Sequence, residues 1–430
     1  MNIKSILIIL SHIFVSICNA QQISPVINND NSVTFFINAP EAEKVQIEGS
    51  FIPPKAKFKI KTFTISKSQK YKMTKERGVW TYTTSPLKSE MYTYRYIVDG
   101  IPTLDSNNKN TVRDVADTLN YFFIQGDIAN HYIDKDIPHG TLSYVWYPST
   151  MNGMSQRRMA IYTPYNYEIN SSANYPVLYL LHGSGGDETS WSDYGRVCQI
   201  LDDMIYSGSC KPLIVVMPNG NIELDAAPGQ SPYMHKTPSA VNVTSMLGQI
   251  ESAFIPEVVT FTEKNYRVLT DKQNRAIAGL SLGGLQTLYI SLNNPDYFDY
   301  IGLFSPQTTN MLNNKRISGL NSLDRNISNI KTIFSLLNGE IPSGNDLTNK
   351  INKVDIYENF DQKLDTLYSR NPKLLYIGIG EDDFVLKLVT DFRAKLDNKQ
   401  YKYYYNYTDG AHTWENWRKY LIDFLPKLFE

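Results

Sequence analysis

The feature that most constrains the fold is the short segment 279–284, which reads GLSLGG. An apolar run at 275–278 precedes it, as in a buried strand, and apolar residues follow at helical spacing until Asn294-Pro295. A G-x-S-x-G turn between a strand and a helix is a nucleophile elbow, whose glycines permit a sharp turn that exposes a serine. The flanking elements favour this interpretation over a glycine-rich turn with an idle serine. The segment predicts an α/β enzyme in which Ser281 is the nucleophile of acyl transfer.

A serine nucleophile needs a base, and His412 is the best placed of the six histidines. It follows a predicted strand at 401–407 and precedes the last predicted helix, which begins near Trp414. The α/β-hydrolases keep their catalytic histidine on a loop beyond the last strand. We therefore predict that His412 is the general base and acid, in preference to a histidine that only caps the helix or packs against Trp414.

The acid that orients the histidine is expected after an earlier strand. The predicted strand 374–379 leads into Gly-Glu-Asp-Asp-Phe at 380–384, where three carboxylates crowd together. We predict Asp383 as the acid and Asp382 as the next candidate, because Glu381 or Asp382 can instead favour the N-terminus of the following helix. The order of serine, aspartate and histidine along the chain is then that of the α/β-hydrolases.

Two backbone N–H groups are needed to stabilise the oxyanion of an acyl-transfer transition state. One is expected from Leu282, directly after the nucleophile, and the other from the glycine-rich loop 182–187, which reads HGSGGD after an apolar strand. Within that loop we predict Ser184, with Gly183 or Gly185 as alternatives. The loop lacks the Lys-Ser/Thr of a phosphate-binding P-loop, and no His, Cys or carboxylate cluster has zinc spacing. We therefore expect no metal and no cofactor.

Two patterns divide the chain. Residues 24–126 contain short alternating strands and no useful helical period, which predicts a small all-β, immunoglobulin-like sandwich. Residues 127–140 resemble a linker, and from 141 to 430 apolar strands alternate with helices, which predicts an α/β-hydrolase fold. The polar, Asn-rich stretch 306–372 interrupts the alternation, and we interpret it as an insertion, either a lid over the catalytic face or a surface excursion. The α/β strands are expected at 177–181, 213–217, 275–278, 301–304, 374–379 and 401–407.

Length, charge and the N-terminus narrow the class of protein. At 430 residues with a formal net charge of −1, the chain suggests two or three domains and gives no sign of a nucleic-acid partner. Residues 1–20 resemble a secretory signal, with Lys4, an apolar core and small residues before Gln21; a short anchor is the alternative. We expect an exported protein, periplasmic or extracellular, without a membrane span. Cys198 and Cys210 then remain, and we predict that both are free thiols.

Five segments of the chain resemble carbohydrate esterase family one, which includes feruloyl esterases, acetyl xylan esterases and relatives of esterase D. They are residues 175–186, 212–220, 263–268, 279–284 and 410–414. The resemblance extends over roughly residues 140–430. Residues 24–126 resemble the early-set sandwich, related to glycogen-binding modules, that often precedes such esterases.

The resemblance implies a serine carboxylic-ester hydrolase that removes feruloyl or acetyl groups from plant cell-wall xylan or its oligosaccharides. The family's nucleophile, acid and histidine fall on Ser281, Asp383 and His412. Two other functions stay open, namely a siderophore esterase of the same fold and a non-catalytic polysaccharide-binding protein. Trp80, the main aromatic candidate in the sandwich, alternates as a core residue does, so we expect weak or no carbohydrate binding there.

Overall fold

The computed structural model describes residues 23–53, 56–60, 63–67, 69–231, 248–308 and 354–430. It divides into two compact units. The first contains Met1–Pro53, Ser68–Thr111 and Leu119–Ile124, and the second contains Pro54–Lys67, Val112–Thr118 and Gln125–Glu430. The predicted signal at 1–20 and most of the predicted insertion, at 309–353, lie outside the described residues.

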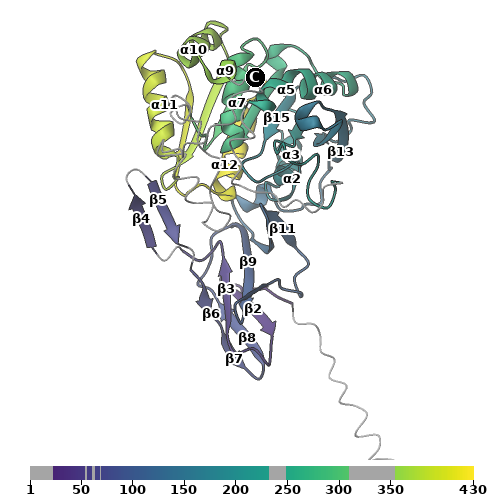
Figure 1. Ribbon diagram of the computed structural model, residues 1–430. Coiled ribbons are helices and arrows are strands. Elements are labelled where there is room, and N and C mark those ends of the chain that lie inside the picture. Colours follow the sequence, from purple (N-terminus) through teal and green to yellow (C-terminus); the bar gives the residue numbers. More distant parts are fainter. Residues whose placement is uncertain (1–22, 54–55, 61–62, 68, 232–247, 309–353) are drawn as a thin grey trace, which may run out of the picture. The chain divides into compact units, whose positions relative to one another are not determined.

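The first unit is all-β, with two antiparallel sheets around one core (Figure 1). One sheet has the order β1-β2-β8-β7, and the other has the order β11-β12-β9-β3-β6 with β10 paired to β9. The bounds are β1 Val26–Ile27, β2 Val33–Asn38, β3 Val45–Gly49, β6 Tyr71–Lys72, β7 Thr74–Glu76, β8 Val79–Thr83, β9 Glu90–Val98, β10 Ile101–Thr103, β11 Thr111–Asp114 and β12 Asp117–Ile124. A separate hairpin of β4 Ala56–Ile60 and β5 Phe63–Lys67 groups with the second unit.

Alternating apolar residues of both sheets fill the core of this unit. Val33 and Phe35 from β2 meet Tyr94 and Tyr96 from β9, all with no exposed surface. Trp80 belongs to the same core and is 4% exposed, which confirms its predicted place. A sandwich core, rather than an exposed ring for sugar stacking, therefore accounts for this tryptophan.

The second unit is built on an eight-stranded sheet with the order β13-β14-β16-β15-β17-β18-β19-β20. Its strands are β13 Thr141–Pro148, β14 Gln156–Thr163, β15 Val177–Leu181, β16 Ile214–Pro218, β17 Arg275–Leu280, β18 Tyr300–Phe304, β19 Leu374–Gly380 and β20 Tyr404–Thr408. β14 pairs antiparallel with β13 and β16, and every pairing from β16 to β20 is parallel. The carboxyl ends of the parallel strands therefore meet at one edge, where the α/β folds place their sites.

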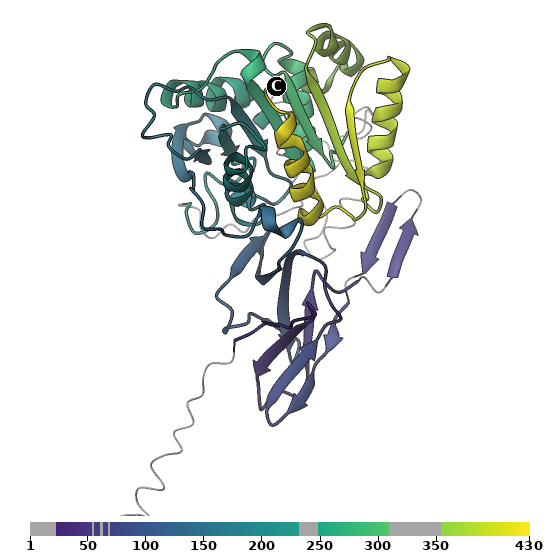
Figure 2. The same cartoon turned by 180° about the vertical axis from the view of Figure 1, so that it is seen from behind.

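Helices cover both faces of this sheet (Figure 1 and, from behind, Figure 2). They are α2 Ser190–Asp193, α3 Val197–Tyr206, α5 Gln249–Ala253, α6 Thr260–Asn265, α7 Leu282–Asn293, α9 Val354–Tyr357, α10 Phe360–Ser369, α11 Leu386–Asn398 and α12 Trp414–Phe424. β15 to β18 bury every residue, as the continuous apolar runs predict for strands covered on both sides. On one face α5, α7, α10 and α11 share a core with the sheet, and on the other α12 packs against Phe304.

The structure differs from the sequence prediction in three places. The antiparallel strands β13 and β14 were not expected, and β20 begins at Tyr404 rather than at residue 401. Tyr401 instead stacks on Tyr368 of α10, with 3.9 Å between ring centres. Residues 354–372 of the predicted insertion form α9 and α10, and α10 buries Phe360 and Leu364 in the main core. That part of the stretch is therefore a structural element of the α/β unit.

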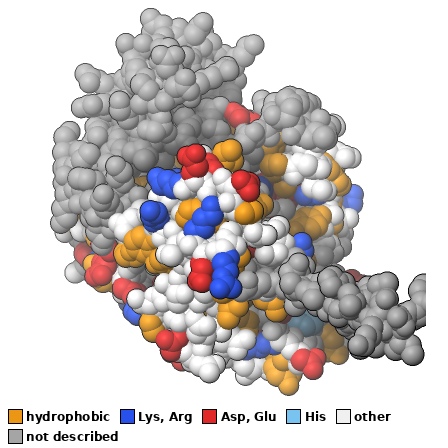
Figure 3. All heavy atoms as spheres, turned by 90° about the horizontal axis from the view of Figure 1, so that it is seen from below, with side chains coloured by type: hydrophobic (Ala, Val, Ile, Leu, Met, Phe, Trp, Pro, Cys, Tyr) orange, Lys and Arg blue, Asp and Glu red, His pale blue; other side chains and the backbone are white. Residues whose placement is uncertain are grey.

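Two features are relevant to nucleic-acid and membrane partners, namely the charge distribution on the surface and the length and hydrophobicity of the helices. On the face in Figure 3, acidic and basic side chains are interspersed among hydrophobic and neutral ones, and no broad patch carries one sign of charge. Within the residues that the structure describes, we find no helix with the length and hydrophobicity needed to span a bilayer.

Candidate active site

Ser281 lies at the sharp turn between β17 and α7. Its backbone has φ 53° and ψ −114°, which is an unusual conformation for a residue with a side chain. The two flanking glycines are needed because other backbone atoms approach them closely, and neither has a positive φ. A Cβ on Gly279 would lie 2.3 Å from the carbonyl oxygen of Gly283, and a Cβ on Gly283 would lie 2.4 Å from that of His182. The strand, helix and neighbouring loop therefore meet closely only because both positions are glycine.

The structure brings the three predicted side chains into one hydrogen-bonded row. His412 Nε2 lies 2.8 Å from Ser281 Oγ, and His412 Nδ1 lies 3.0 Å from each carboxylate oxygen of Asp383. The carboxylate of Asp383 has no exposed surface, while the imidazole of His412 is 13% exposed. An imidazole held between a buried carboxylate and a serine hydroxyl is arranged to accept the hydroxyl proton.

Of the three neighbouring acids, Asp383 is the one whose carboxylate lies within hydrogen-bonding distance of the His412 imidazole. It follows β19, and its Oδ1 also accepts the backbone N–H of Val385 at 3.0 Å, which fixes the carboxylate plane. Glu381 is exposed and Asp382 is half-buried; the backbone N–H of Asp382 donates to Gly410. The geometry therefore favours Asp383 over the two alternatives.

Aromatic rings enclose the histidine. The ring of Phe384 lies 4.3 Å from that of His412, and Trp417 of α12 meets the imidazole edge-on at 5.1 Å and 88°. Trp417 packs in turn on Trp414 at 5.2 Å. These contacts restrict rotation of the imidazole, so its two nitrogens stay aimed at the serine and the aspartate.

The glycine-rich loop after β15 lies beside the nucleophile. A Cβ on Gly183 would lie 3.3 Å from Cβ of Ser281, so the loop and the elbow are in contact. Leu282 is the first residue of α7, where backbone N–H groups lack partners within the helix. The N–H groups of Leu282 and Ser184 remain our predicted donors to an oxyanion.

The other described histidines have structural partners. The ring of His182 is buried, and its Nδ1–H donates to the carbonyl of Gly183 at 2.8 Å while Nε2 accepts the N–H of Gly220 at 2.7 Å. Burial lowers the pKa of His182 and keeps it neutral. His131 and His139 bond to the carboxylates of Asp203 and Asp202. His235 lies outside the described residues.

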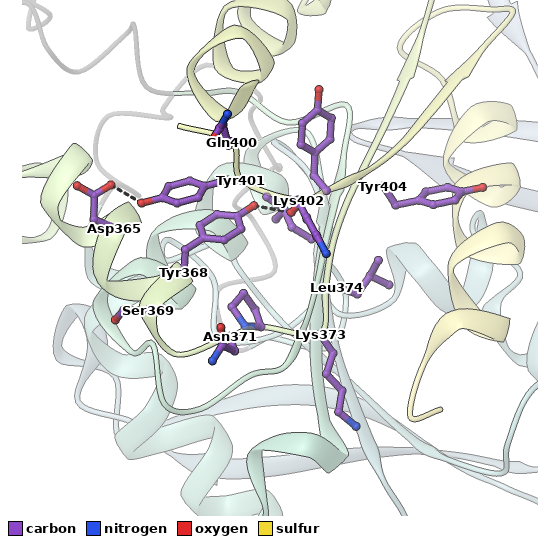
Figure 4. A pocket seen from close by; sticks show the side chains of 13 residues that line it. Asp365, Tyr368, Ser369, Asn371, Lys373, Leu374, Gln400, Tyr401, Lys402 and Tyr404 are labelled. Atoms are coloured by element: carbon purple, nitrogen blue, oxygen red, sulfur yellow. Dashed lines mark hydrogen bonds between the residues drawn. The ribbon is translucent and has the colours of Figure 1, made fainter. Parts of the chain in front are cut away.

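A groove of about 700 Å³ lies elsewhere, at the amino-terminal ends of β19 and β20 (Figure 4). Its lining includes the stacked Tyr368 and Tyr401, and Asp365 accepts the hydroxyl of Tyr401 at 2.7 Å. None of the three predicted catalytic residues lines it, so the groove is separate from the candidate active site. Among the described residues, no group of three or more His, Cys, Asp or Glu side chains is arranged to hold a metal ion.

A serine at the end of a central parallel strand, bonded to a histidine that bonds to a buried aspartate, is the geometry of serine hydrolases with the α/β-hydrolase fold. The comparison with protein families assigns the chain to one family of hydrolases. The family Esterase, described as "Putative esterase", matches residues 151–428. The chain belongs to the Esterase family.

Relatives agree with this assignment. An endo-1,4-beta-xylanase/feruloyl esterase of Xylanibacter ruminicola is 31% identical over 288 residues, which cover 66% of this chain and 36% of that protein. An acetyl esterase of Caldicellulosiruptor saccharolyticus is 24% identical over 257 residues, covering 59% of this chain and 82% of that protein. The chain thus matches only about a third of the length of the xylanase/feruloyl esterase. The resemblance to carbohydrate esterase family one is confirmed.

One solved structure resembles nearly the whole chain. The enterobactin esterase FES of Shigella flexneri has a TM-score of 0.57 at 14% identity, with 93% of each chain covered. At this identity the likeness concerns the fold alone. The predicted fold class, an α/β-hydrolase preceded in the chain by an all-β sandwich, is confirmed.

Proposed function

We propose that this chain is an exported serine carboxylic-ester hydrolase that removes feruloyl or acetyl groups from xylan or its oligosaccharides. The observation that carries the proposal is the row of hydrogen bonds from Ser281 through His412 to the buried Asp383. A neutral serine hydroxyl is a weak nucleophile, and this arrangement supplies the base that activates it. Membership of the Esterase family supports the same reaction class.

The proposed reaction has two steps. Ser281 Oγ attacks the ester carbonyl carbon while its proton passes to His412 Nε2, and the N–H groups of Leu282 and Ser184 stabilise the oxyanion. The C–O bond to the sugar then breaks, and His412 gives the proton to the departing sugar oxygen. Water attacks the acyl-enzyme and loses a proton to His412, and collapse of this second intermediate releases the acid and re-protonates Ser281. Asp383 holds the Nδ1–H and stabilises the imidazolium in both steps.

The names of the relatives support the proposed substrate class. Feruloyl esterase and acetyl esterase are in the names of relatives that match 66% and 59% of this chain, and the first of these names also includes a xylanase. An ester-linked feruloyl or acetyl group on xylan is the substrate that accommodates both names. The enterobactin esterase supports a second candidate, a siderophore ester, because its fold resembles 93% of this chain.

The test compares the chain from residue 21 onward with Ser281→Ala on methyl ferulate, feruloylated arabinoxylan, acetylated xylan and a ferric catecholate siderophore ester. Ser291→Ala is the matched control, because among the described residues the Ser291 hydroxyl donates to the Thr287 carbonyl of the same helix, at 2.8 Å. We expect turnover of a xylan ester by the wild type and the control, and none above background by Ser281→Ala. Substantial activity in Ser281→Ala would disprove the mechanism. A higher kcat/KM on the siderophore ester than on the xylan esters would show that the substrate is a siderophore ester instead.

A further inference from the structure

A short hairpin tip, Val112–Thr118, groups with the second unit although its strands β11 and β12 extend into the first sheet. From this tip, Arg113 donates to the carboxylate of Asp187 and to the Thr189 hydroxyl at 3.3 Å. The side chain of Arg113 is 24% exposed, and that of Asp187 has no exposed surface. Asp187 closes the glycine-rich loop that carries Ser184. The proposed oxyanion loop therefore ends on a buried charge whose cation comes from a remote segment.

The carboxylate of Asp187 organises the end of this loop. Its Oδ1 accepts the backbone N–H of Thr189 at 3.0 Å and the Thr189 hydroxyl at 2.8 Å, while Oδ2 accepts from Arg113. The backbone N–H of Asp187 donates to Ser190 Oγ at 3.0 Å. Arg113 also donates to the carbonyl of Val115 at 2.8 Å, so the same guanidinium fixes the tip itself. The loop and the tip are thus tied together through one carboxylate.

Negative charge is concentrated around this contact. Glu188 is buried next to Asp187, and burial raises the pKa of Glu188, with the charge of Asp187 as the next cause. Arg158 pairs with Glu188 at 2.6 Å, and among the described residues Arg113 is the ion-pair partner of Asp187. A buried carboxylate that loses its cation is strongly destabilised, and nearby acids increase the effect. The loop would then shift to expose Asp187 to water.

The tip also contacts the loop by packing. A Cβ on Gly185 would lie 2.6 Å from Cγ1 of Val115, and Gly185 has φ +76°. Val115 itself has φ +55°, a conformation that β-branched residues rarely adopt unless their surroundings fix it. The tip therefore lies directly against the residue that follows Ser184.

We propose that Arg113 is a positioning residue for the oxyanion site. By neutralising Asp187, it holds the loop 183–187 so that the Ser184 N–H faces the oxygen of the tetrahedral intermediate. This role rests on the proposed serine esterase mechanism, and it does not require Arg113 to touch the substrate. The defect of an Arg113 variant should therefore appear in kcat rather than in KM, since the oxyanion contact strengthens only in the transition state.

The experiment compares Arg113→Met, Asp187→Asn and the double variant, using 4-nitrophenyl acetate so that the result does not depend on the natural acyl group. We expect Arg113→Met to lower kcat between about 10-fold and 100-fold, less than the full loss of an oxyanion donor, with KM within about three-fold. In the double variant the Asn oxygen still accepts from Thr189 without an unpaired charge, so kcat should return to within about five-fold of wild type. Arg370→Met, which removes the exposed Arg370–Asp296 pair, is the matched control and should leave kcat unchanged.

Two results would overturn the proposal. Arg113→Met with kcat within two-fold of wild type would show that the loop does not depend on this cation. A raised KM with unchanged kcat, and no recovery in the double variant, would make Arg113 a substrate contact instead. Thermal unfolding of the wild type and the four variants keeps the inference separate from the proposed function. If the wild type hydrolyses no ester, the function fails, yet recovery of Tm in the double variant still tests the Arg113–Asp187 coupling.

Discussion

Replacing Asp383 by Asn tests the most specific statement about the site, because the structure fixes how the amide must lie. Oδ1 of Asp383 accepts the backbone N–H of Val385 at 3.0 Å, so the amide oxygen will keep that position. The amide nitrogen then faces His412 Nδ1, where a carboxylate oxygen now lies 3.0 Å away. That nitrogen donates, so it favours the tautomer in which Nδ1 accepts and the proton lies on Nε2, where His412 donates to Ser281 Oγ and cannot take its proton. The amide oxygen at Oδ1 also lies 3.0 Å from Nδ1, but it lacks the negative charge that stabilises the imidazolium.

The expected loss is large because the wrong tautomer disables the base while the fold stays intact. We expect kcat to fall about 10⁴-fold, as in other triads with this change, which corresponds to about 5 kcal/mol of transition-state stabilisation. The assay is the steady-state hydrolysis of methyl ferulate, with thermal unfolding as a check on folding. Asp382→Asn is the matched control, and it should keep most of the activity. Equal or greater loss in Asp382→Asn, or more than a tenth of wild-type kcat in Asp383→Asn, would refute the assignment of the acid.

Two further predictions follow from buried titratable groups. The pKa of His182 in the folded chain lies below its ordinary value of about 6.5, so the unfolded chain binds more protons at this residue. The free energy of unfolding should therefore fall by up to about 1.4 kcal/mol per pH unit as the pH drops below about 6.5. Urea unfolding at three pH values should show this slope reduced in His182→Asn, and equal slopes would contradict it. Burial raises the pKa of Cys198 and Cys210 to about 12. Both free thiols should therefore react slowly with a disulfide reagent at pH 8 in the folded protein and rapidly in guanidinium. Fast modification of the folded protein would contradict this prediction.

Buried parallel strands were predictable from the sequence, because a strand covered on both faces is a continuous apolar run. β15 was predicted with its observed bounds, and β17 and β18 differ from the prediction only at their ends. The free state of Cys198 and Cys210 was also predicted and is confirmed. These features depend on residues close together in the chain, which is why periodicity and flanking residues suffice.

The strand β14 was missed because its second and third residues are arginines, which periodicity assigns to the surface. In the structure Arg157 is fully buried and donates to the carbonyls of Asn219 and Asn221, at 2.6 and 2.9 Å. Arg158 pairs with the buried Glu188. These partners are distant in sequence, so the burial of the arginines has no local signal. The helix α10 was missed for a related reason, since its polar majority hides a narrow apolar stripe.

The amino-acid sequence was sufficient to place Ser281 after a buried strand and His412 after the last strand, since both motifs are local. It predicted Asp383 as the acid but kept Asp382 as the next candidate, because adjacent residues share the same pattern of neighbours. Folding selects the carboxylate that reaches the imidazole, and it also brings Arg113 to Asp187 from 74 positions away. The physical reason is that a hydrogen bond depends on ångström-scale direction, which sheet register and packing set and linear spacing does not.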